Sequence, residues 1–180
     1  GNITISRDAV YDYVEHIATS ARCSYKGIKA AIDCANGSAS VTAAELFGKL
    51  GLNFDIYNSD PDGVNINKGC GSTHIDHIAE IVRKDGYNVG FAFDGDADRL
   101  LCVDEDGNLV DGDKIMAILA KHFKDKNMLN NNTVVTTVMS NMGFFEMCRN
   151  HGINTVQTKV GDRYVLENML ENGYNFGGEQ

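Results

Sequence analysis

The chain has 180 residues, of which 43% are apolar, so it can bury a sizeable core in one full domain or two small ones. Its formal net charge of −9 argues against nucleic acid or an anionic membrane surface as a partner, because both need a basic patch. No apolar run approaches the roughly 18 residues that a membrane-spanning helix needs.

The first part of the chain alternates helical and extended patterns. In chain order, these patterns predict a helix at 9–19, a strand at 28–34, a helix at 39–51, a strand at 53–58, a helix at 74–86, and strands at 89–94 and 99–107. Ser72 and Thr73 are good N-cap residues for the helix that follows them. The order β-α-β-α-β-β predicts a mostly parallel sheet that is covered by helices.

The pattern restarts after Asp106 and Gly107. We expect a helix at 111–126, a strand at 133–139, a helix at 141–152, a strand at 153–158, a helix at 162–173 and the start of a further strand and loop at YNFGGEQ. In the first of these helices, Ile115, Leu119 and Phe123 have the spacing of a core face. The sequence therefore predicts two similar α/β domains, at 1–107 and 108–180, each with a mostly parallel mixed sheet covered by helices.

Polar segments follow several of the predicted strands. The carboxyl ends of parallel strands gather on one edge of a sheet and form its ligand crevice. We therefore expect ligand contacts from four loops, which lie at 34–38, 94–99, 158–163 and 177–180.

The stretch FAFDGDADR places Asp94, Asp96 and Asp98 at alternating positions after an apolar run. Neighbouring carboxylates destabilise one another unless a cation lies between them. Gly95 and Ala97 are small enough to let the backbone curl, so that the carboxylates can converge on one Mg²⁺ or Mn²⁺ ion. Arg99 follows directly and can bind a phosphate through two hydrogen bonds. A metal, a phosphate and an arginine together are typical of phosphoryl transfer.

Three other interpretations of this stretch were weighed. An EF-hand loop that starts at Asp94 would have glycine at its sixth position, where this chain has Arg99, and helices rather than strands on either side. A phosphatase of the haloacid-dehalogenase type would use Asp94 as its nucleophile, but its motif continues with Gly and Thr, where this chain has Ala97 and Asp98. A solvated acidic turn without a ligand is the third interpretation.

The segment DGDADR resembles the metal-binding loop of the α-D-phosphohexomutases. Within that superfamily, three further segments are similar to the phosphoglucosamine mutase branch: PDGVNINKGCGSTH at 61–74, TKVGDRYV at 158–165 and GGEQ at 177–180. Together with DCANG at 33–37, these matches run in the family's order over nearly the whole chain. The resemblance covers the second domain and most of the third domain of a four-domain enzyme.

This resemblance implies a Mg²⁺-dependent isomerase, with Mn²⁺ as an alternative metal. Enzymes of that branch interconvert glucosamine 6-phosphate and glucosamine 1-phosphate through a phosphoserine and a glucosamine 1,6-bisphosphate intermediate. The resemblance implies that Asp94, Asp96 and Asp98 are the metal ligands and that Arg99 contacts the transferring phosphate. The implied or candidate substrate-binding residues are Glu179, Lys159, Gly161, Asp162, Arg163 and Ser140.

The chain also departs from the family pattern. The family's Ser-His-Asn stretch, which carries the reactive serine of the first domain, is absent here, as is the phosphate-binding loop of the fourth domain. We therefore expect this chain to be a fragment that binds metal weakly and is inactive without domains 1 and 4. A phosphoglucomutase/phosphomannomutase and an isolated metal-binding module are the alternatives. The five scattered cysteines are typical of free thiols in a reducing cytosol, which favours a cytoplasmic protein with a phosphosugar substrate.

Overall fold

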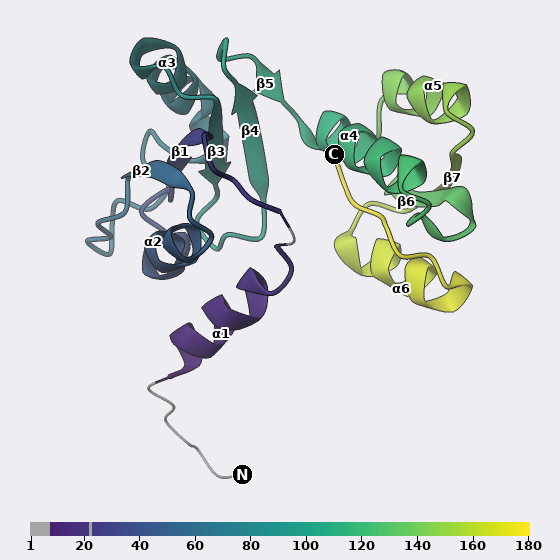
Figure 1. The fold of residues 1–180 in the computed structure, drawn as a ribbon, viewed down its shortest axis with the longest axis horizontal. Coiled ribbons are helices and arrows are strands. Elements are labelled where there is room, and N and C mark those ends of the chain that lie inside the picture. The colour runs from purple at the N-terminus through teal and green to yellow at the C-terminus, as the bar shows by residue number, and fades with distance from the viewer. Residues whose placement is uncertain (1–7, 22) are drawn as a thin grey trace. The chain divides into compact units, whose positions relative to one another are not determined.

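The computed structural model describes residues 8–21 and 23–180, so residues 1–7 and 22 of the first predicted domain lie outside the described part (Figure 1). The chain divides into two compact units, Gly1–Leu109 (unit 1) and Val110–Gln180 (unit 2). Each unit has its own sheet and its own buried apolar side chains, and the two are described separately below.

Unit 1 is built on a mixed sheet. Its elements are α1 (Ala9–Ala18), β1 (Lys29–Asp33), α2 (Ala39–Lys49), β2 (Asn53–Tyr57), the 3₁₀ helix η1 (Ser72–His74), α3 (Ile75–Asp85), β3 (Val89–Phe93), β4 (Leu100–Asp104) and β5 (Leu109–Val110). Within the described residues the sheet has five strands in the order β2-β1-β3-β4-β5. Strand β1 pairs in parallel with β2 and β3, whereas β3 and β4 are antiparallel.

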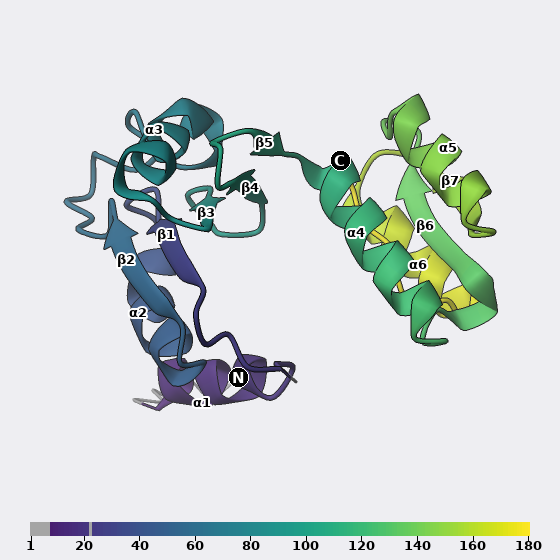
Figure 2. The same cartoon turned by 45° about the horizontal axis from the view of Figure 1, so that its top comes forward.

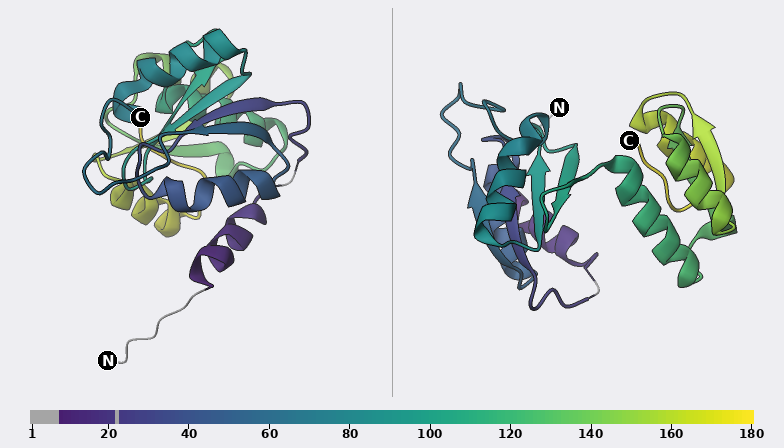
Figure 3. Two further views of the ribbon diagram at one scale, coloured as in Figure 1. Left: turned by 90° about the vertical axis from the view of Figure 1, so that its left-hand side faces the viewer. Right: turned by 90° about the horizontal axis from the view of Figure 1, so that it is seen from above.

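Helices cover both faces of this sheet, because apolar side chains alternate along its central strands. Ala31 and Ala92 face α3 and pack with Ile78 and Val82. The neighbouring Ile32 belongs to the opposite cluster, which includes side chains from α2. Figure 3 shows α3 and α2 on opposite sides of the sheet. The result is a three-layer arrangement in which the carboxyl ends of β1, β2 and β3 lie at one edge.

Unit 2 repeats the principle with a smaller sheet (Figure 2). Its elements are α4 (Gly112–Asp125), the 3₁₀ helix η2 (Asn130–Asn132), β6 (Thr133–Thr137), α5 (Met142–Asn150), β7 (Asn154–Thr158) and α6 (Asp162–Asn172). Strands β6 and β7 pair in parallel, with Thr133 opposite Asn154 and Thr137 opposite Thr158. Val134 packs with α4 and α5, whereas α6 packs against the strands through Val165.

The predicted α/β fold class is confirmed, with some local differences. The predicted N-cap residues Ser72 and Thr73 are instead the first residues of η1, and His74 precedes α3. In α4 the buried apolar side chains are Met116 and Ala120, whereas Leu119 is 38% exposed. Helix α4 is apolar over a wide arc, so tertiary packing rather than local spacing decides which stripe is buried.

Two further observations complete the fold. The strand that YNFGGEQ was expected to begin is a single parallel bridge between Val135 and Gly177 in the described residues. The structure, over its described residues, contains no helix long and apolar enough to cross a membrane.

An added methyl group should have opposite effects on stability at two glycines of unit 1, because Gly90 is packed against other side chains and Gly48 faces open space. A Cβ at Gly90 would lie 2.5 Å from Val103 Cγ2 and 2.8 Å from Val82 Cγ2, so Gly90→Ala should cost about 1–3 kcal/mol of unfolding free energy. Gly48 in α2 has open space at the same position, so Gly48→Ala should stabilise the helix by up to about 1 kcal/mol. Urea denaturation followed by circular dichroism measures both, and equal shifts in the two variants would contradict the packing described.

Candidate functional site

The acidic loop, residues 94–99, joins β3 to β4 in unit 1. Asp94 follows the last residue of β3 and is only 2% exposed, whereas Asp96 and Asp98 are not buried. The loop is curled, since the backbone N–H of Ala97 donates to the carbonyl of Asp94 and Ala97 has a left-handed φ of 60°. One side-chain oxygen from each of the three aspartates lies within 4.8 Å of the other two. The structure therefore brings together the three carboxylates that the sequence pattern predicted.

Arg99 closes the acidic loop on Asp94. Its backbone N–H donates to Asp94 Oδ1 at 3.1 Å, and its Nε lies 2.8 Å from Asp94 Oδ2 and 3.5 Å from Asp98 Oδ1. The 2.8 Å contact is an ion pair rather than a well-formed hydrogen bond, so the buried Oδ2 has no hydrogen-bond partner among the described residues. The guanidinium of Arg99 is thus the cation beside this buried oxygen, and it offsets part of the negative charge of Asp94.

The acidic loop shifts the pKa values of two of its carboxyl groups in opposite directions. Burial acts to raise the pKa of Asp94, but the backbone N–H and the guanidinium of Arg99 outweigh it, so the net pKa is lowered. Partial desolvation, followed by the charges of Asp96 and Asp94, raises the pKa of Asp98. Crowding of like charges therefore remains at the exposed end of the loop, even with Arg99 beside it.

Close backbone packing holds Gly95 of the acidic loop. The N–H of Ser38 donates to the carbonyl of Gly95 at 2.9 Å, and a Cβ at Gly37 would collide with that same carbonyl. On its other side, a Cβ at Gly95 would lie 2.7 Å from Ile66 Cδ1 and 2.8 Å from Asn67 Nδ2. Two loops from distant parts of unit 1 thus enclose the acidic loop, and only glycines fit at this contact.

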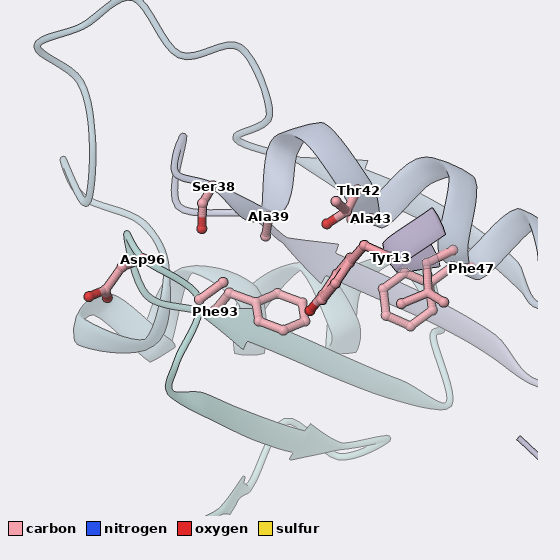
Figure 4. Close-up of a pocket in the computed structure, with 10 residues that line it drawn as sticks. Tyr13, Ser38, Ala39, Thr42, Ala43, Phe47, Phe93 and Asp96 are labelled. Carbon is pink, nitrogen blue, oxygen red and sulfur yellow. The ribbon is translucent and has the colours of Figure 1, made fainter. Parts of the chain in front are cut away.

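A pocket of about 270 Å³ lies beside the acidic loop in unit 1. Figure 4 shows Asp96 and Ser38 at one end of the pocket, with the rings of Phe93, Tyr13 and Phe47 extending away from them. The pocket is polar where it meets the acidic loop and aromatic farther away. The remaining residues that line it are Ala39, Thr42, Ala43, Leu46 and Ala97.

In unit 2 the KVGDR turn, residues 159–163, meets the GGEQ loop, residues 177–180. The N–H of Gly161, whose φ is 130°, donates to Glu179 Oε1 at 2.8 Å. A Cβ at Gly112 would lie 2.7 Å from the carbonyl oxygen of Glu179 and 2.6 Å from the carbonyl carbon of Gln180. The predicted substrate-binding turn and the predicted GGEQ loop are therefore neighbours, and the start of α4 supports the second of them.

The other predicted substrate-binding residues differ in how exposed they are and in which side chains they contact. Lys159 and Asp162 are exposed residues of the same turn. Lys159 Nζ lies 5.8 Å from the centre of the Tyr164 ring. The Arg163 guanidinium is engaged with Glu167, with Nε and Oε1 2.7 Å apart. Ser140 is buried, and its hydroxyl is hydrogen-bonded to that of Thr136.

Two buried carboxylates escaped the sequence analysis. Asp33 is fully buried at the end of β1, and Asp113 is 2% exposed near the start of α4. Asp113 accepts a hydrogen bond from the backbone N–H of Asn141, which begins the segment leading into α5. The only local signal for Asp33 was its place next to the loop at 34–38, which was predicted to face the crevice, and none of the predicted crevice loops adjoins Asp113.

With this geometry established, the family follows from comparison with known proteins. Residues 11–107 match the family domain described as phosphoglucomutase/phosphomannomutase, alpha/beta/alpha domain II, and residues 111–180 match alpha/beta/alpha domain III. The chain belongs to the phosphoglucomutase/phosphomannomutase family. The predicted resemblance to the phosphohexomutases is confirmed.

Individual relatives agree with this assignment. A phosphoglucosamine mutase from Acetivibrio thermocellus is 57% identical over 169 residues, which cover 94% of this chain and 38% of the relative. A phosphoglucosamine mutase from Clostridium acetobutylicum is 52% identical over 180 residues, covering 100% of this chain and 40% of the relative. A crystal structure of a phosphoglucomutase/phosphomannomutase family protein from Burkholderia thailandensis has a TM-score of 0.83 and 26% identity, covering 95% of this chain and 37% of that chain. The chain thus spans only 38–40% of the length of these two curated relatives.

The contact between Gly112 and the GGEQ loop gives a test within unit 2. Gly112→Ala should push the carbonyls of Glu179 and Gln180 away and weaken the hydrogen bond from Gly161, because backbone cannot yield as a flexible side chain does. Amide hydrogen exchange at Gly161 should therefore accelerate, whereas Gly48→Ala in unit 1 should leave it unchanged. Unaltered exchange in both variants would contradict the support that α4 gives to this loop.

Proposed function

We propose that this chain is part of a phosphoglucosamine mutase, a cytoplasmic isomerase that interconverts glucosamine 6-phosphate and glucosamine 1-phosphate. The observation that carries the proposal is the convergence of Asp94, Asp96 and Asp98 in a loop that closes on an arginine. The names of relatives that are 52–57% identical support the choice of sugar.

The residues of the acidic loop fit a divalent metal. Three carboxylates offer hard oxygen ligands, and one oxygen of each lies within 4.8 Å of the other two. Asp94, Asp96 and Asp98 would hold Mg²⁺, with Mn²⁺ as an alternative. When bound, such an ion stabilises the negative charge of a transferring phosphoryl group.

The chain's own side chains have separate roles in this proposal. Arg99 holds Asp94 in place and, being largely exposed, can bind a phosphate oxygen of the substrate. Glu179 accepts hydrogen bonds from the sugar hydroxyls, since an ionised carboxylate only accepts. Gly161 fixes Glu179 through its backbone N–H. The surrounding residues that we assign to the substrate are Lys159, Asp162, Arg163 and Ser140.

Arg163 and Ser140 would have to leave their present partners to reach a substrate. Arg163 is paired with Glu167 in an exposed ion pair, which is weak enough to exchange for a phosphate or a hydroxyl. Ser140 is buried and its hydroxyl is hydrogen-bonded to that of Thr136, so it would bind a substrate by exchanging that hydrogen bond for one to the sugar.

The rest of the enzyme would come from segments that this chain does not contain. We propose that a first domain supplies the reactive phosphoserine and a fourth domain binds the non-transferring phosphate, with glucosamine 1,6-bisphosphate as the intermediate. Coverage of only 38–40% of the two relatives supports this division, and we therefore expect the isolated chain to be inactive. The cytoplasmic assignment is supported by the free thiols of all five cysteines, which fall within the described residues.

A second candidate is a mutase of the same family that acts on glucose or mannose phosphates. It is favoured by the match to the Burkholderia thailandensis family protein, with its TM-score of 0.83. A third is an isolated metal-binding module, favoured because the acidic loop is complete within this chain.

Metal binding by the isolated chain tests the site itself. Asp96→Asn should weaken Mn²⁺ binding roughly tenfold or more, because it removes one charged ligand from the group. Asp106→Asn, in the turn at the opposite end of β4 from the acidic loop, is the matched control and should leave the affinity unchanged. Electron paramagnetic resonance of free Mn²⁺ measures the affinity, and equal binding by both variants would show that the acidic loop is not the site.

Sugar preference separates the mutase candidates. The full-length protein should turn over glucosamine phosphate with a kcat/KM at least about tenfold above those for glucose and mannose phosphates. A coupled assay with each sugar phosphate measures the ratio. Equal or faster turnover of glucose or mannose phosphate would replace the proposed substrate with that of the second candidate.

A further inference from the structure

Asp33 is a fully buried carboxylate with two backbone partners. It is the last residue of β1, and its Oδ1 accepts a hydrogen bond from the N–H of Ala35 at 2.9 Å. Its Oδ2 accepts one from the N–H of Gly71, also at 2.9 Å, and lies 3.5 Å from Nδ1 of His77, whose side chain is 42% exposed. One carboxylate therefore joins the loop that directly follows it to Gly71, which is 38 residues further along the chain.

Both of these loops have backbone conformations that need support. Ala35 has a φ of 54°, in the left-handed region that is costly for a residue with a Cβ. Gly71 has a φ of 73° and approaches β3 so closely that a Cβ there would lie 2.6 Å from the carbonyl oxygen of Phe93, the residue before Asp94. The loops are also joined to each other, since the N–H of Asn67 donates to the carbonyl of Ala35 at 2.9 Å.

The same two loops enclose the acidic loop. The segment that begins with Ala35 continues to Gly37 and Ser38, which pack against and bond to the carbonyl of Gly95. The segment that ends at Gly71 includes Asn67, which lies against the other side of Gly95. A contiguous set of contacts thus runs from the carboxylate of Asp33 through two loops to the residue between Asp94 and Asp96.

We propose that Asp33 is a positioning residue for the acidic loop. By bonding both enclosing loops, it fixes Gly95 from two sides and keeps the carboxylates of Asp94 and Asp96 in register with Asp98. The inference rests on the proposed function, because it takes the acidic loop to be a metal site. Metal affinity then depends on a residue that makes no contact with the metal, as outer hydrogen-bond partners do in other metal sites.

The role requires a carboxylate rather than any polar side chain. Two N–H donors reach Asp33 from different loops, and an ionised carboxylate offers an acceptor oxygen to each. An asparagine offers one acceptor, and its NH₂ group would face the remaining N–H. That donor would be buried without a partner, and its loop would shift to regain one.

The test compares Asp33→Asn with a control of the same chemistry. Asp55 on the neighbouring strand β2 is an exposed carboxylate that accepts a partly buried hydrogen bond from the Tyr87 hydroxyl at 2.6 Å, and it has no described bond to the enclosing loops. Asp33→Asn should weaken Mn²⁺ binding about 10- to 100-fold, whereas Asp55→Asn should leave it unchanged. Circular dichroism and urea denaturation establish that each variant is folded at the temperature of the binding measurement.

A second measurement uses the unaltered chain and does not depend on the variant folding. Because coupling is reciprocal, saturation with Mg²⁺ should slow amide hydrogen exchange at Ala35 and Gly71. The amide of Asn88, which donates to Lys29 at the other end of β1, should be unaffected.

The outcomes separate the inference from the proposed function. If the unaltered chain binds no Mn²⁺, the proposed metal site fails and the inference fails with it. If the unaltered chain binds Mn²⁺ and Asp33→Asn binds equally well, the metal site stands and Asp33 is only a structural residue. If Asp33→Asn does not fold, amide exchange decides: slowing at Ala35 and Gly71 supports the inference, and equal exchange with and without Mg²⁺ overturns it.

Discussion

The structure of unit 1 depends on holding like charges together. One oxygen from each of Asp94, Asp96 and Asp98 lies within 4.8 Å of the others, although carboxylates at that distance repel one another. The ion pair with Arg99 offsets part of this repulsion, and the packing around Gly95 prevents the loop from relaxing. Without a ligand, the remaining repulsion only destabilises the fold, whereas a divalent ion bound by the three carboxylates would remove it.

Unit 2 uses a similar device for a different purpose. Glu179 accepts a backbone hydrogen bond from Gly161, which joins two loops, and Asp113 in the first turn of α4 accepts one from Asn141, which joins a helix to the loop before α5. Such bonds are directional and stronger than bonds between neutral groups. They let short loops at the ends of β6 and β7 keep a fixed geometry without a large sheet beneath them. Asp33 follows the same principle in unit 1.

The sequence predicted a structural feature correctly where the residues that determine it are close together in the chain. The alternation of carboxylates in DGDADR and the switch from period 2 to period 3.6 are each determined by residues that are a few positions apart. The predicted buried face of α4 was wrong at Leu119, although Phe123 does pack against the core. A helix with a wide apolar arc can bury more than one stripe, and contacts from other segments decide which stripe is buried. Ser72 and Thr73 failed as caps because the helical turn begins earlier, directly after Gly71.

The parts of the site that sequence did not reveal depend on distant contacts. Asp33 and Gly71 are 38 residues apart, and the approach of Gly112 to Gln180 spans almost the whole of unit 2. No periodicity or spacing rule reports such pairs. The left-handed φ of Ala35 is likewise invisible to propensity, because alanine has no preference for it and tertiary bonds impose it.

The most direct test of the account is anomalous diffraction from crystals of this chain grown with Mn²⁺. The account predicts an anomalous peak between the side chains of Asp94, Asp96 and Asp98, with an oxygen from each bonded to it. A map with no peak there, and with the three carboxylates turned apart, would contradict it.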